Sequence, residues 1–228
     1  MFNNKTILIT GGTGSFGKKF VRKLLDDYKC KKIIIFSRDE LKQFELREAL
    51  VSHKNAKALR FYIGDIRDRN RVFDSLTNVD FVVHSAALKQ IEAAEYNSQE
   101  CIKTNILGTQ NIIDGCIEKN VKKVISLSTD KAVDPINLYG ATKLAADKLV
   151  ISSNLKAMHK DTIFSVVRYG NVINSRGSVI PFFKTLLKNK SKFIPLTHND
   201  MTRFFISLED SVEFVVKSFY RMNGGEVF

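Results

Sequence analysis

The sequence predicts an α/β protein with a doubly wound parallel sheet, and three features lead to this prediction. Short apolar runs rich in β-branched residues alternate with longer segments of helical periodicity. The first apolar run, Thr6–Thr10, leads directly into a glycine-rich turn and then into a helical segment. The apolar runs are nearly continuous, which is typical of strands buried on both faces of a parallel sheet. Helices between the strands then cover both faces through right-handed crossovers.

The elements alternate regularly up to Tyr169. The predicted strands are Thr6–Thr10, Lys32–Phe36, Leu59–Ile63, Phe81–His84, Lys123–Leu127 and Thr162–Val167. The predicted helices between them are Ser15–Tyr28, Arg38–Ser52, Asn70–Ser75, Glu100–Asn120 and Tyr139–Asn154.

Beyond Tyr169 the alternation loosens. We predict a helix over Val179–Leu187, an extended segment over Phe193–Leu196, a strand over Arg203–Ile206 and, with Ser207 as N-cap, a helix over Leu208–Arg221. The last residues fall inside a further predicted strand, as if the chain were cut there. This change divides the chain into a first domain, residues 1–170, and a second region, residues 171–228.

The amino-acid composition limits the cellular compartments in which the protein is expected. With 228 residues and 44% hydrophobic content, the chain can bury one sizeable core. Its three cysteines (Cys30, Cys101 and Cys116) follow no pattern, which argues against disulfides or a metal site and favours a reducing cytoplasm. No run approaches the roughly 20 apolar residues of a membrane span, and the N-terminus does not resemble a signal peptide. We therefore predict a cytoplasmic protein with no membrane partner and no metal.

The net charge of +12 admits two interpretations. A basic chain can bind nucleic acid, or it can carry a generally basic surface that suits small anionic ligands. The lysines are scattered, without a basic tail or a basic stripe interleaved with aromatic residues. We therefore favour the second interpretation and predict no nucleic-acid partner.

The glycine-rich turn predicts a dinucleotide site. Glycines 11, 14 and 17 follow the spacing G-x-x-G-x-x-G between a strand and a helix. They permit a tight turn, close approach of a pyrophosphate and close packing of helix on strand, while the helix N-terminus offers amides to the phosphates. The alternative is a purely structural turn. The predicted cofactor-binding residues here are Gly11, Thr13, Gly14, Ser15, Phe16 and Gly17.

The end of the second strand favours NADP over NAD. NAD-binding chains usually carry an acidic residue here for the ribose hydroxyls. In this chain Ser37 and Arg38 come first, and a guanidinium suits a phosphate, although Arg38 could also be a surface residue beside Asp39. The predicted cofactor contacts of this strand are Ser37, Arg38, Asp39, Glu40, Leu41 and Lys42, joined by Asp65 and Ile66 after the third strand. His84-Ser85-Ala86-Ala87 ends the fourth strand, where small residues leave room for a cofactor.

A cluster of proton-transfer groups follows the fifth strand. Tyr139 and Lys143 are four residues apart, on one face of a helix. A nearby ammonium stabilises a phenolate, so we expect a lowered pKa for Tyr139, which could then act as a base on a sugar hydroxyl. Lys143 could also hold the nicotinamide ribose.

Three further residues of this cluster end the strand itself. Thr129 can orient a substrate hydroxyl, and Asp130 and Lys131 follow it directly. An acid and a base side by side suit elimination of water, because one group removes a proton next to a carbonyl while the other protonates the leaving hydroxyl. The alternative is a solvated loop that carries two charges. The position at the carboxyl edge of the sheet, where ligands bind, favours the catalytic interpretation.

These residues resemble those of extended short-chain dehydrogenase/reductases and, more closely, of inverting UDP-N-acetylglucosamine 4,6-dehydratases that begin pseudaminic acid synthesis. The resemblance extends over essentially the whole chain and includes a Rossmann-like fold. It is carried by Gly11–Gly17, residues 37–42, Ala86–Lys89, Lys103–Asn105, Ser128–Lys143, Arg168–Val172, residues 175–183 and Met201–Phe204.

The resemblance implies a reaction. With tightly bound NADP, Tyr139 would assist oxidation at C4 of UDP-N-acetylglucosamine. Lys131 would then remove the C5 proton, and Asp130 would help expel the C6 hydroxyl as water. After return of the hydride to C6 and a proton to the opposite face of C5, the product would be UDP-2-acetamido-2,6-dideoxy-β-L-arabino-hexos-4-ulose. Retaining enzymes of similar fold carry Asp-Glu where this chain has Asp130-Lys131.

The resemblance also implies a substrate pocket and an assembly. Residues 1–170 would form the NADP-binding domain and residues 171–228 a partial substrate-binding region, since the family has a further C-terminal part. A homo-oligomer is implied, with a hexamer as one form. Ser85, Gln90–Ile91 and Asn174 depart from the usual family residues. The residues implied in binding are Ser85, Lys89, Asn171, Val179 and Arg203 for substrate and Val172 for cofactor.

Three other functions are left open by the sequence. One is a retaining 4,6-dehydratase or a 4-epimerase acting on another UDP-sugar. The second is a catalytically inactive NADP-binding module. The third is a nucleic-acid binder, whose retention on DNA would depend steeply on salt.

Overall fold

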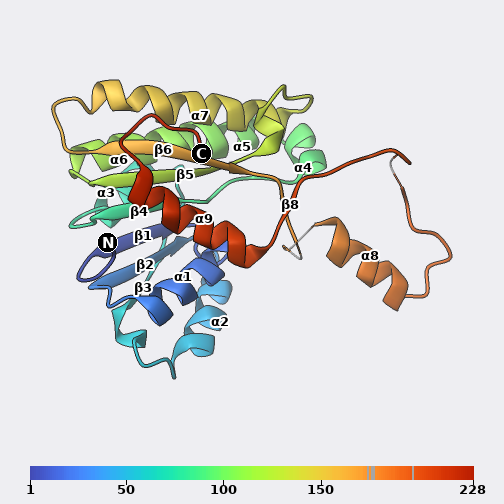
Figure 1. Cartoon of the computed structure of the whole chain (residues 1–228), viewed down its shortest axis with the longest axis horizontal. Coiled ribbons are helices and arrows are strands. Elements are labelled where there is room, and N and C mark those ends of the chain that lie inside the picture. Colours follow the sequence, from blue (N-terminus) through green and yellow to red (C-terminus); the bar gives the residue numbers. More distant parts are fainter. Residues whose placement is uncertain (174, 176–177, 197) are drawn as a thin grey trace.

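A computed structural model of the chain describes residues 1–173, 175, 178–196 and 198–228. Its centre is a six-stranded parallel sheet in the order β3-β2-β1-β4-β5-β6 (Figure 1). The chain therefore reverses direction across the sheet between β1 and β4, where ligands bind in doubly wound folds. The predicted fold class is confirmed. The strands are β1 (Thr6–Thr10), β2 (Lys32–Ser37), β3 (Leu59–Ile63), β4 (Phe81–His84), β5 (Lys123–Thr129) and β6 (Ile163–Tyr169).

Helices cover both faces of the sheet and bury two apolar clusters (Figure 1). Buried side chains such as Ile7 and Ile9 point to one face of β1, and Leu8 points to the other, as the period of a strand requires. The first face is covered by α1 (Ser15–Asp27), α2 (Glu40–Leu50) and α9 (Leu208–Arg221). The second face is covered by α3 (Arg69–Ser75), α6 (Gly108–Glu118) and α7 (Leu138–Lys156).

The prediction of one continuous, regular helix over Glu100–Asn120 is wrong. The structure has α5 (Ser98–Ile102), a π-helical turn at Lys103–Leu107, and then α6. A π-helical turn widens the helix by one residue and is frequent at functional sites. The prediction also missed the short helix α4 (Ile91–Tyr96) and the 3₁₀-helices Ala56–Ala58 and Asp130–Ala132.

The region after β6 holds a second, two-stranded sheet at the carboxyl edge of the first. Its strands are β7 (Asn171–Val172) and β8 (Phe205–Ile206), which pair in parallel. The sequence predicted β8 two residues too long and missed β7. Helix α8 (Val179–Lys188) matches its prediction to within one residue and lies apart from the main sheet (Figure 1). Phe193–Leu196 belongs to neither a helix nor a strand.

The last residues add to the edge of the main sheet. Val227 forms a parallel bridge with Val166 of β6, and the amide of Phe228 donates to the carbonyl of Val166 over 2.9 Å. The predicted extended pairing of this segment is therefore present, although it amounts to a bridge and not to a full strand.

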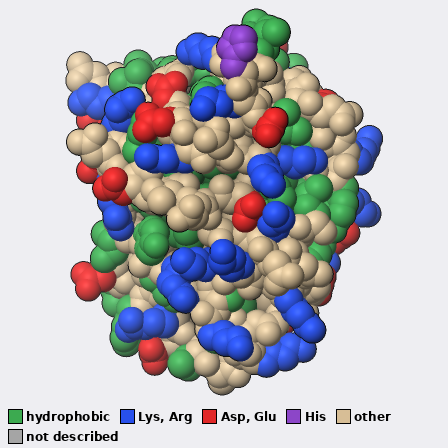
Figure 2. All heavy atoms as spheres, turned by 90° about the vertical axis from the view of Figure 1, so that its left-hand side faces the viewer, with side chains coloured by type: hydrophobic (Ala, Val, Ile, Leu, Met, Phe, Trp, Pro, Cys, Tyr) green, Lys and Arg blue, Asp and Glu red, His purple; other side chains and the backbone are tan. Residues whose placement is uncertain are grey.

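The face at the amino ends of the strands carries many Lys and Arg side chains (Figure 2). Acidic side chains are interspersed among them, most visibly in the upper half of that view. Within the part of the chain that the structure describes, no helix is long and apolar enough to cross a membrane. No group of three or more His, Cys, Asp or Glu side chains among those same residues could hold a metal ion.

Candidate functional site

The glycine turn forms a backbone cradle at the carboxyl end of β1. Gly11 has φ of +64°, and a Cβ there would lie 3.0 Å from the backbone of Ala86. A Cβ on Gly17 would lie 2.5 Å from Gly12 Cα, so α1 packs directly on the turn. Gly14, the N-cap of α1, has no side chain to cap the first amides of that helix. These amides and the helix dipole are suited to a pyrophosphate.

Phe16 takes part in the core through its ring. The ring stacks on Phe20 and Tyr169 at centroid distances of 5.5 and 6.4 Å. Thr13 is buried in the same turn.

The end of β2 combines a cap with an exposed guanidinium. Asp39 accepts a hydrogen bond from the Lys42 amide (3.0 Å) and pairs with the Lys42 ammonium, so these two residues begin α2. Ser37 is buried, and its Oγ accepts from Gln43 Nε2 over 3.0 Å. Glu40 and the exposed Leu41 lie in the first turn of α2.

Arg38, which follows β2, extends to Asp65, which follows the neighbouring strand β3. Arg38 is 53% exposed, and its Nη1 lies 3.5 Å from Asp65 Oδ2. Arg67 donates to the same oxygen through Nε (2.9 Å) and Nη2 (2.6 Å). Although burial acts to raise the pKa of Asp65, the hydrogen bonds from Arg67 outweigh it and lower that pKa. The side chain of Ile66 is buried in the core and would contact a Cβ on Gly108.

The Thr129–Lys131 segment forms a compact polar cluster after β5. Thr129 Oγ1 donates to Asp130 Oδ1 over 2.9 Å, and Lys131 Nζ donates to the same oxygen over 3.0 Å. Lys131 Nζ also lies 3.3 Å from Asn171 Oδ1. The 3₁₀-helix that begins at Asp130 holds these side chains at the edge of the sheet. Asp130 and Lys131 are therefore in direct contact, as a shared proton-transfer role requires.

Tyr139 lies next to this cluster, but its pKa runs opposite to the sequence-based expectation. Its phenol is hydrogen-bonded to Thr129. Burial raises the pKa of Tyr139 to about 12, and the carboxylates of Asp130 and Asp147 act in the same direction. The expected lowering by Lys143 is wrong for this structure, because the Lys143 ammonium donates to the carbonyl of Leu127 (2.7 Å).

Lys143 itself is buried, with 4% exposure. Burial lowers its pKa, and the negative charge of Asp147 acts against that lowering. The helical spacing of Tyr139 and Lys143 on α7 was predicted correctly.

Two buried polar residues near the cluster were given no role from the sequence, although Asn105 belongs to the Lys103–Asn105 segment that carries the family resemblance. Asp147 of α7 accepts from Ser128 Oγ and Arg168 Nε, each over 2.8 Å. Asn105, in the π-helical turn, bonds both the amide (2.8 Å) and the carbonyl (2.9 Å) of Leu88. The position of Asp147, four residues after Lys143, is a signal that could have indicated the first. The π-helical turn that directs Asn105 inward has no such signal.

The predicted substrate residues fall into two groups. Asn171 contacts Lys131, and Ser85 donates to the carbonyl of Thr10 over 2.6 Å, so both lie at the carboxyl edge of the main sheet. Lys89 follows β4 and is exposed, yet desolvation by neighbouring atoms lowers its pKa. Val179 begins α8, and Arg203 is exposed and donates to the carbonyl of Thr202. Neither is brought to the Asp130–Lys131 pair by any contact described here.

Val172 pairs with Ile206 in the small sheet. Asn174, Arg176 and Gly177, which the sequence analysis named as a departure from the family or as part of its pattern, lie outside the described residues.

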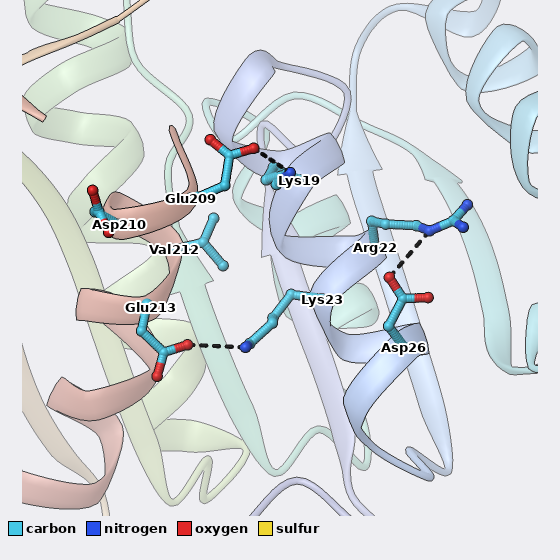
Figure 3. Close-up of a pocket in the computed structure, with 8 residues that line it drawn as sticks. All are labelled: Lys19, Arg22, Lys23, Asp26, Glu209, Asp210, Val212 and Glu213. Carbon is cyan, nitrogen blue, oxygen red and sulfur yellow. Dashed lines mark hydrogen bonds and ion pairs between the residues drawn. The ribbon is translucent and has the colours of Figure 1, made fainter. Parts of the chain in front are cut away.

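Two surface hollows lie near the site elements. One separates the loop after β4 from α8 and is lined by Gln90, Val179 and Phe182 among others. The other lies between α1 and α9, and most of the charged side chains that line it form ion pairs (Figure 3). Lys19 pairs with Glu209, and Lys23 lies 2.9 Å from Glu213. The second hollow is therefore a charged contact between two helices, distinct from the cluster at the end of β5.

Comparisons with known proteins place this geometry among enzymes of nucleotide sugars. A family model described as polysaccharide biosynthesis protein matches residues 7–228. An inverting UDP-N-acetylglucosamine 4,6-dehydratase from Campylobacter jejuni subsp. jejuni serotype O:23/36 (strain 81-176) is 59% identical over 228 residues, which are 100% of this chain and 67% of that protein. A UDP-glucose 4-epimerase from Rickettsia bellii (strain OSU 85-389) is 46% identical over 231 residues, covering 100% of this chain and 66% of the epimerase.

A solved structure agrees in fold. The X-ray structure of Pen from Bacillus thuringiensis superposes with a TM-score of 0.94 at 40% identity and covers 100% of this chain and 68% of that chain. This chain therefore spans about two thirds of the length of each of these three proteins.

Proposed function

This chain belongs to the polysaccharide biosynthesis protein family, and on that premise we propose that it catalyses the 4,6-dehydration of UDP-N-acetylglucosamine with inversion at C5. The observation that carries the proposal is the contact of Lys131 Nζ with Asp130 Oδ1 (3.0 Å), next to the Tyr139 phenol that is hydrogen-bonded to Thr129. The inverting dehydratase from Campylobacter jejuni, at 59% identity over the whole chain, supports the same reaction.

The cradle at Gly11–Gly17 fits a dinucleotide, because its glycines leave no room for side chains between the turn, Ala86 and α1. When bound, a nicotinamide cofactor supplies an acceptor for hydride from the sugar and later the donor that returns it. We propose NADP as this cofactor. Arg38, which follows β2, and Lys42 in the first turn of α2 support it, because their cations suit a ribose phosphate.

The chain's own groups then divide the proton transfers. As the phenolate, Tyr139 Oη removes the proton of the C4 hydroxyl, and Thr129 orients that hydroxyl. A 4-keto group acidifies the C5 proton, which Lys131 Nζ removes. Asp130 protonates the departing C6 oxygen, so water leaves. Because Asp130 and Lys131 share a hydrogen bond, transfer of one proton between them converts the ion pair into an acid and a free amine.

A 4-epimerase is the second candidate, and the 46% identity to the Rickettsia bellii enzyme supports it. An epimerase needs a base at C4 but no groups for elimination at C5 and C6. The contact between Asp130 and Lys131 therefore favours dehydration.

Incubation of the chain with UDP-N-acetylglucosamine, followed by proton NMR of the sugar, tests the proposal. We expect a C6 methyl signal, a 4-keto sugar and an inverted C5, without added cofactor. Retention at C5, or a 4-epimer that keeps its C6 hydroxyl, would replace the proposed reaction by one of its rivals. An unchanged substrate, with NADP still bound, would leave only a binding module.

We also propose a cytoplasmic homo-oligomer that acts in pseudaminic acid synthesis, with residues 1–170 holding the cofactor and residues 171–228 contributing to the substrate side. The contact of Asn171 with Lys131 supports the joining of these two regions at one site. Sedimentation equilibrium would measure the oligomeric state.

A further inference from the structure

Asp147 carries a buried carboxylate close to the proposed catalytic residues, and it has no part in the proposed reaction. Asp147 is 1% exposed on the inner face of α7. One of its oxygens, Oδ2, accepts from Ser128 Oγ of β5 and from Arg168 Nε of β6, each over 2.8 Å. Within the described residues its other oxygen, Oδ1, is buried and accepts no hydrogen bond. A buried carboxylate with an unused acceptor is costly, which points to a role beyond packing.

The surroundings of Asp147 connect it to the reacting groups. Tyr139, Lys143 and Asp147 recur every four residues, so they line one face of α7. The ammonium of Lys143 is 4% exposed and donates to the Leu127 carbonyl. An isolated buried ammonium tends to lose its proton, and a nearby carboxylate opposes this loss.

We propose that Asp147 is a positioning residue that keeps Lys143 charged and thereby sets the charge state of the Lys143–Tyr139 pair. Ser128 and Arg168 hold the carboxylate in place through their hydrogen bonds to Oδ2. This role rests on the proposed dehydratase function, because that function requires Tyr139 as a base. The carboxylate raises the pKa of both Lys143 and Tyr139, which agrees with the geometry.

Other ionisable groups on the surrounding helices are hydrogen-bonded to other partners. Lys103 of the π-helical turn pairs with Glu100, and Asp114 of α6 accepts from Gln110, so both are engaged elsewhere. Glu95 of α4 accepts from the Leu138 amide. The remaining groups that act on the pair are His84 of β4, Cys101 of α5, Asp130 of the 3₁₀-helix and Tyr169 of β6, whereas Lys131 and Arg168 contact Asp130 and Asp147.

The test is Asp147→Asn, which keeps the shape and removes the charge. Loss of the negative charge favours the neutral amine of Lys143 and the phenolate of Tyr139, so both limbs of the pH–rate profile should move to lower pH. We expect the ratio of the rate at pH 9 to the rate at pH 7 to fall by roughly threefold or more. The control is Asp161→Asn, which makes the same substitution at an exposed position and should keep the original profile.

A second measurement does not depend on turnover. Tyrosine labelled with ¹³C at Cζ allows the phenols to be titrated by NMR, and Tyr139→Phe identifies the signal of Tyr139. The signal should titrate at lower pH in Asp147→Asn than in the unmodified chain. If the unmodified chain produces no 4-keto sugar, the proposed function fails while this titration still tests the role of Asp147.

Should Asp147→Asn not fold because Arg168 is left unpaired, the double variant Asp147→Asn/Arg168→Met removes both charges. We expect it to shift the Tyr139 titration in the same direction, since Asp147 and not Arg168 acts on Lys143. An unshifted profile and an unshifted Tyr139 signal, in a folded variant, would overturn the proposal and leave Asp147 a structural residue.

Discussion

Gly140 and Lys131 touch through their backbones: a side-chain carbon at position 140 would overlap the carbonyl oxygen of Lys131. The 3₁₀-helix that carries Asp130 and Lys131 is thereby seated on the first turn of α7, one residue after Tyr139. The absence of a side chain at position 140 therefore determines how closely the elimination groups approach the phenol.

Gly140→Ala should lower the dehydration rate by about 100-fold, because a displacement of about 1 Å is enough to misalign reacting groups. Binding of the cofactor should change little, because the glycine cradle lies on β1 and α1. Steady-state kinetics and cofactor retention measure the two effects. Ala141→Ser, at the exposed neighbouring position, is the control. Equal loss of activity in both variants would argue against the backbone contact as the cause.

Lys131→Met should reduce dehydration by roughly 10²- to 10⁴-fold, the usual contribution of a general base. The cofactor should still copurify, because Lys131 contacts Asp130 and Asn171 and not the glycine turn. Lys148→Met, on an exposed face of α7, provides the same substitution away from the site. Normal turnover by Lys131→Met would remove this residue from the mechanism.

Arg38→Ala should weaken NADPH binding by about tenfold or more and leave NADH binding nearly unchanged, because a guanidinium recognises the additional phosphate. Fluorescence titration with both reduced nucleotides measures the difference. Arg47→Ala tests whether loss of any exposed arginine on this side has the same effect. A parallel loss of both nucleotides, or of neither, would favour NAD as the cofactor.

His84 should make the fold sensitive to acid. It lies fully buried between Thr10 Oγ1 (2.8 Å) and Thr109 Oγ1 (3.0 Å), and burial lowers its pKa to about 3, with the charge of Lys143 acting in the same direction. Between that value and its unfolded pKa near 6.5, only the unfolded chain binds the proton, so stability is lost as pH falls.

Urea unfolding at pH 7 and pH 5 measures this contribution. His84 alone should account for a loss of about 2 kcal/mol between these two values, at about 1.4 kcal/mol for each full pH unit of linkage. The variant His84→Gln should be less stable at pH 7 but should lack this component, whereas His159→Asn, at an exposed position, should retain it. An unchanged pH dependence in His84→Gln would contradict the assignment.

Periodicity predicted the sheet well because the buried strands are almost wholly apolar. Thr6–Thr10 and Phe81–His84 were placed without error, and β5 was two residues longer than predicted because Ser128 and Thr129 continue the strand with polar side chains. Both are buried, which the hydrophobic pattern does not reveal. The short strand β7 was missed because its pairing with β8 depends on residues more than thirty positions apart.

Sequence proximity was enough to predict that Asp130 contacts Lys131 and that Tyr139 and Lys143 share one helix, α7. The site was not predictable where tertiary burial sets the chemistry. The upward shift in the pKa of Tyr139 comes mainly from burial, which no spacing rule contains. Asp147 and Arg168 meet only because α7 packs across β6.

The π-helical turn at Lys103–Leu107 changes the rotation of α6 about the helix axis relative to α5. Gly108 of α6 thereby packs closely against Ile66. The side chain of Asn105 is hydrogen-bonded to Leu88 and Thr142. Deleting one residue from this turn would restore ordinary winding and rotate everything on one side of it by about 100°. Asn105 would then swing out of reach of Leu88, and the loop that carries Lys89 would lose its anchor without any change to the sheet itself.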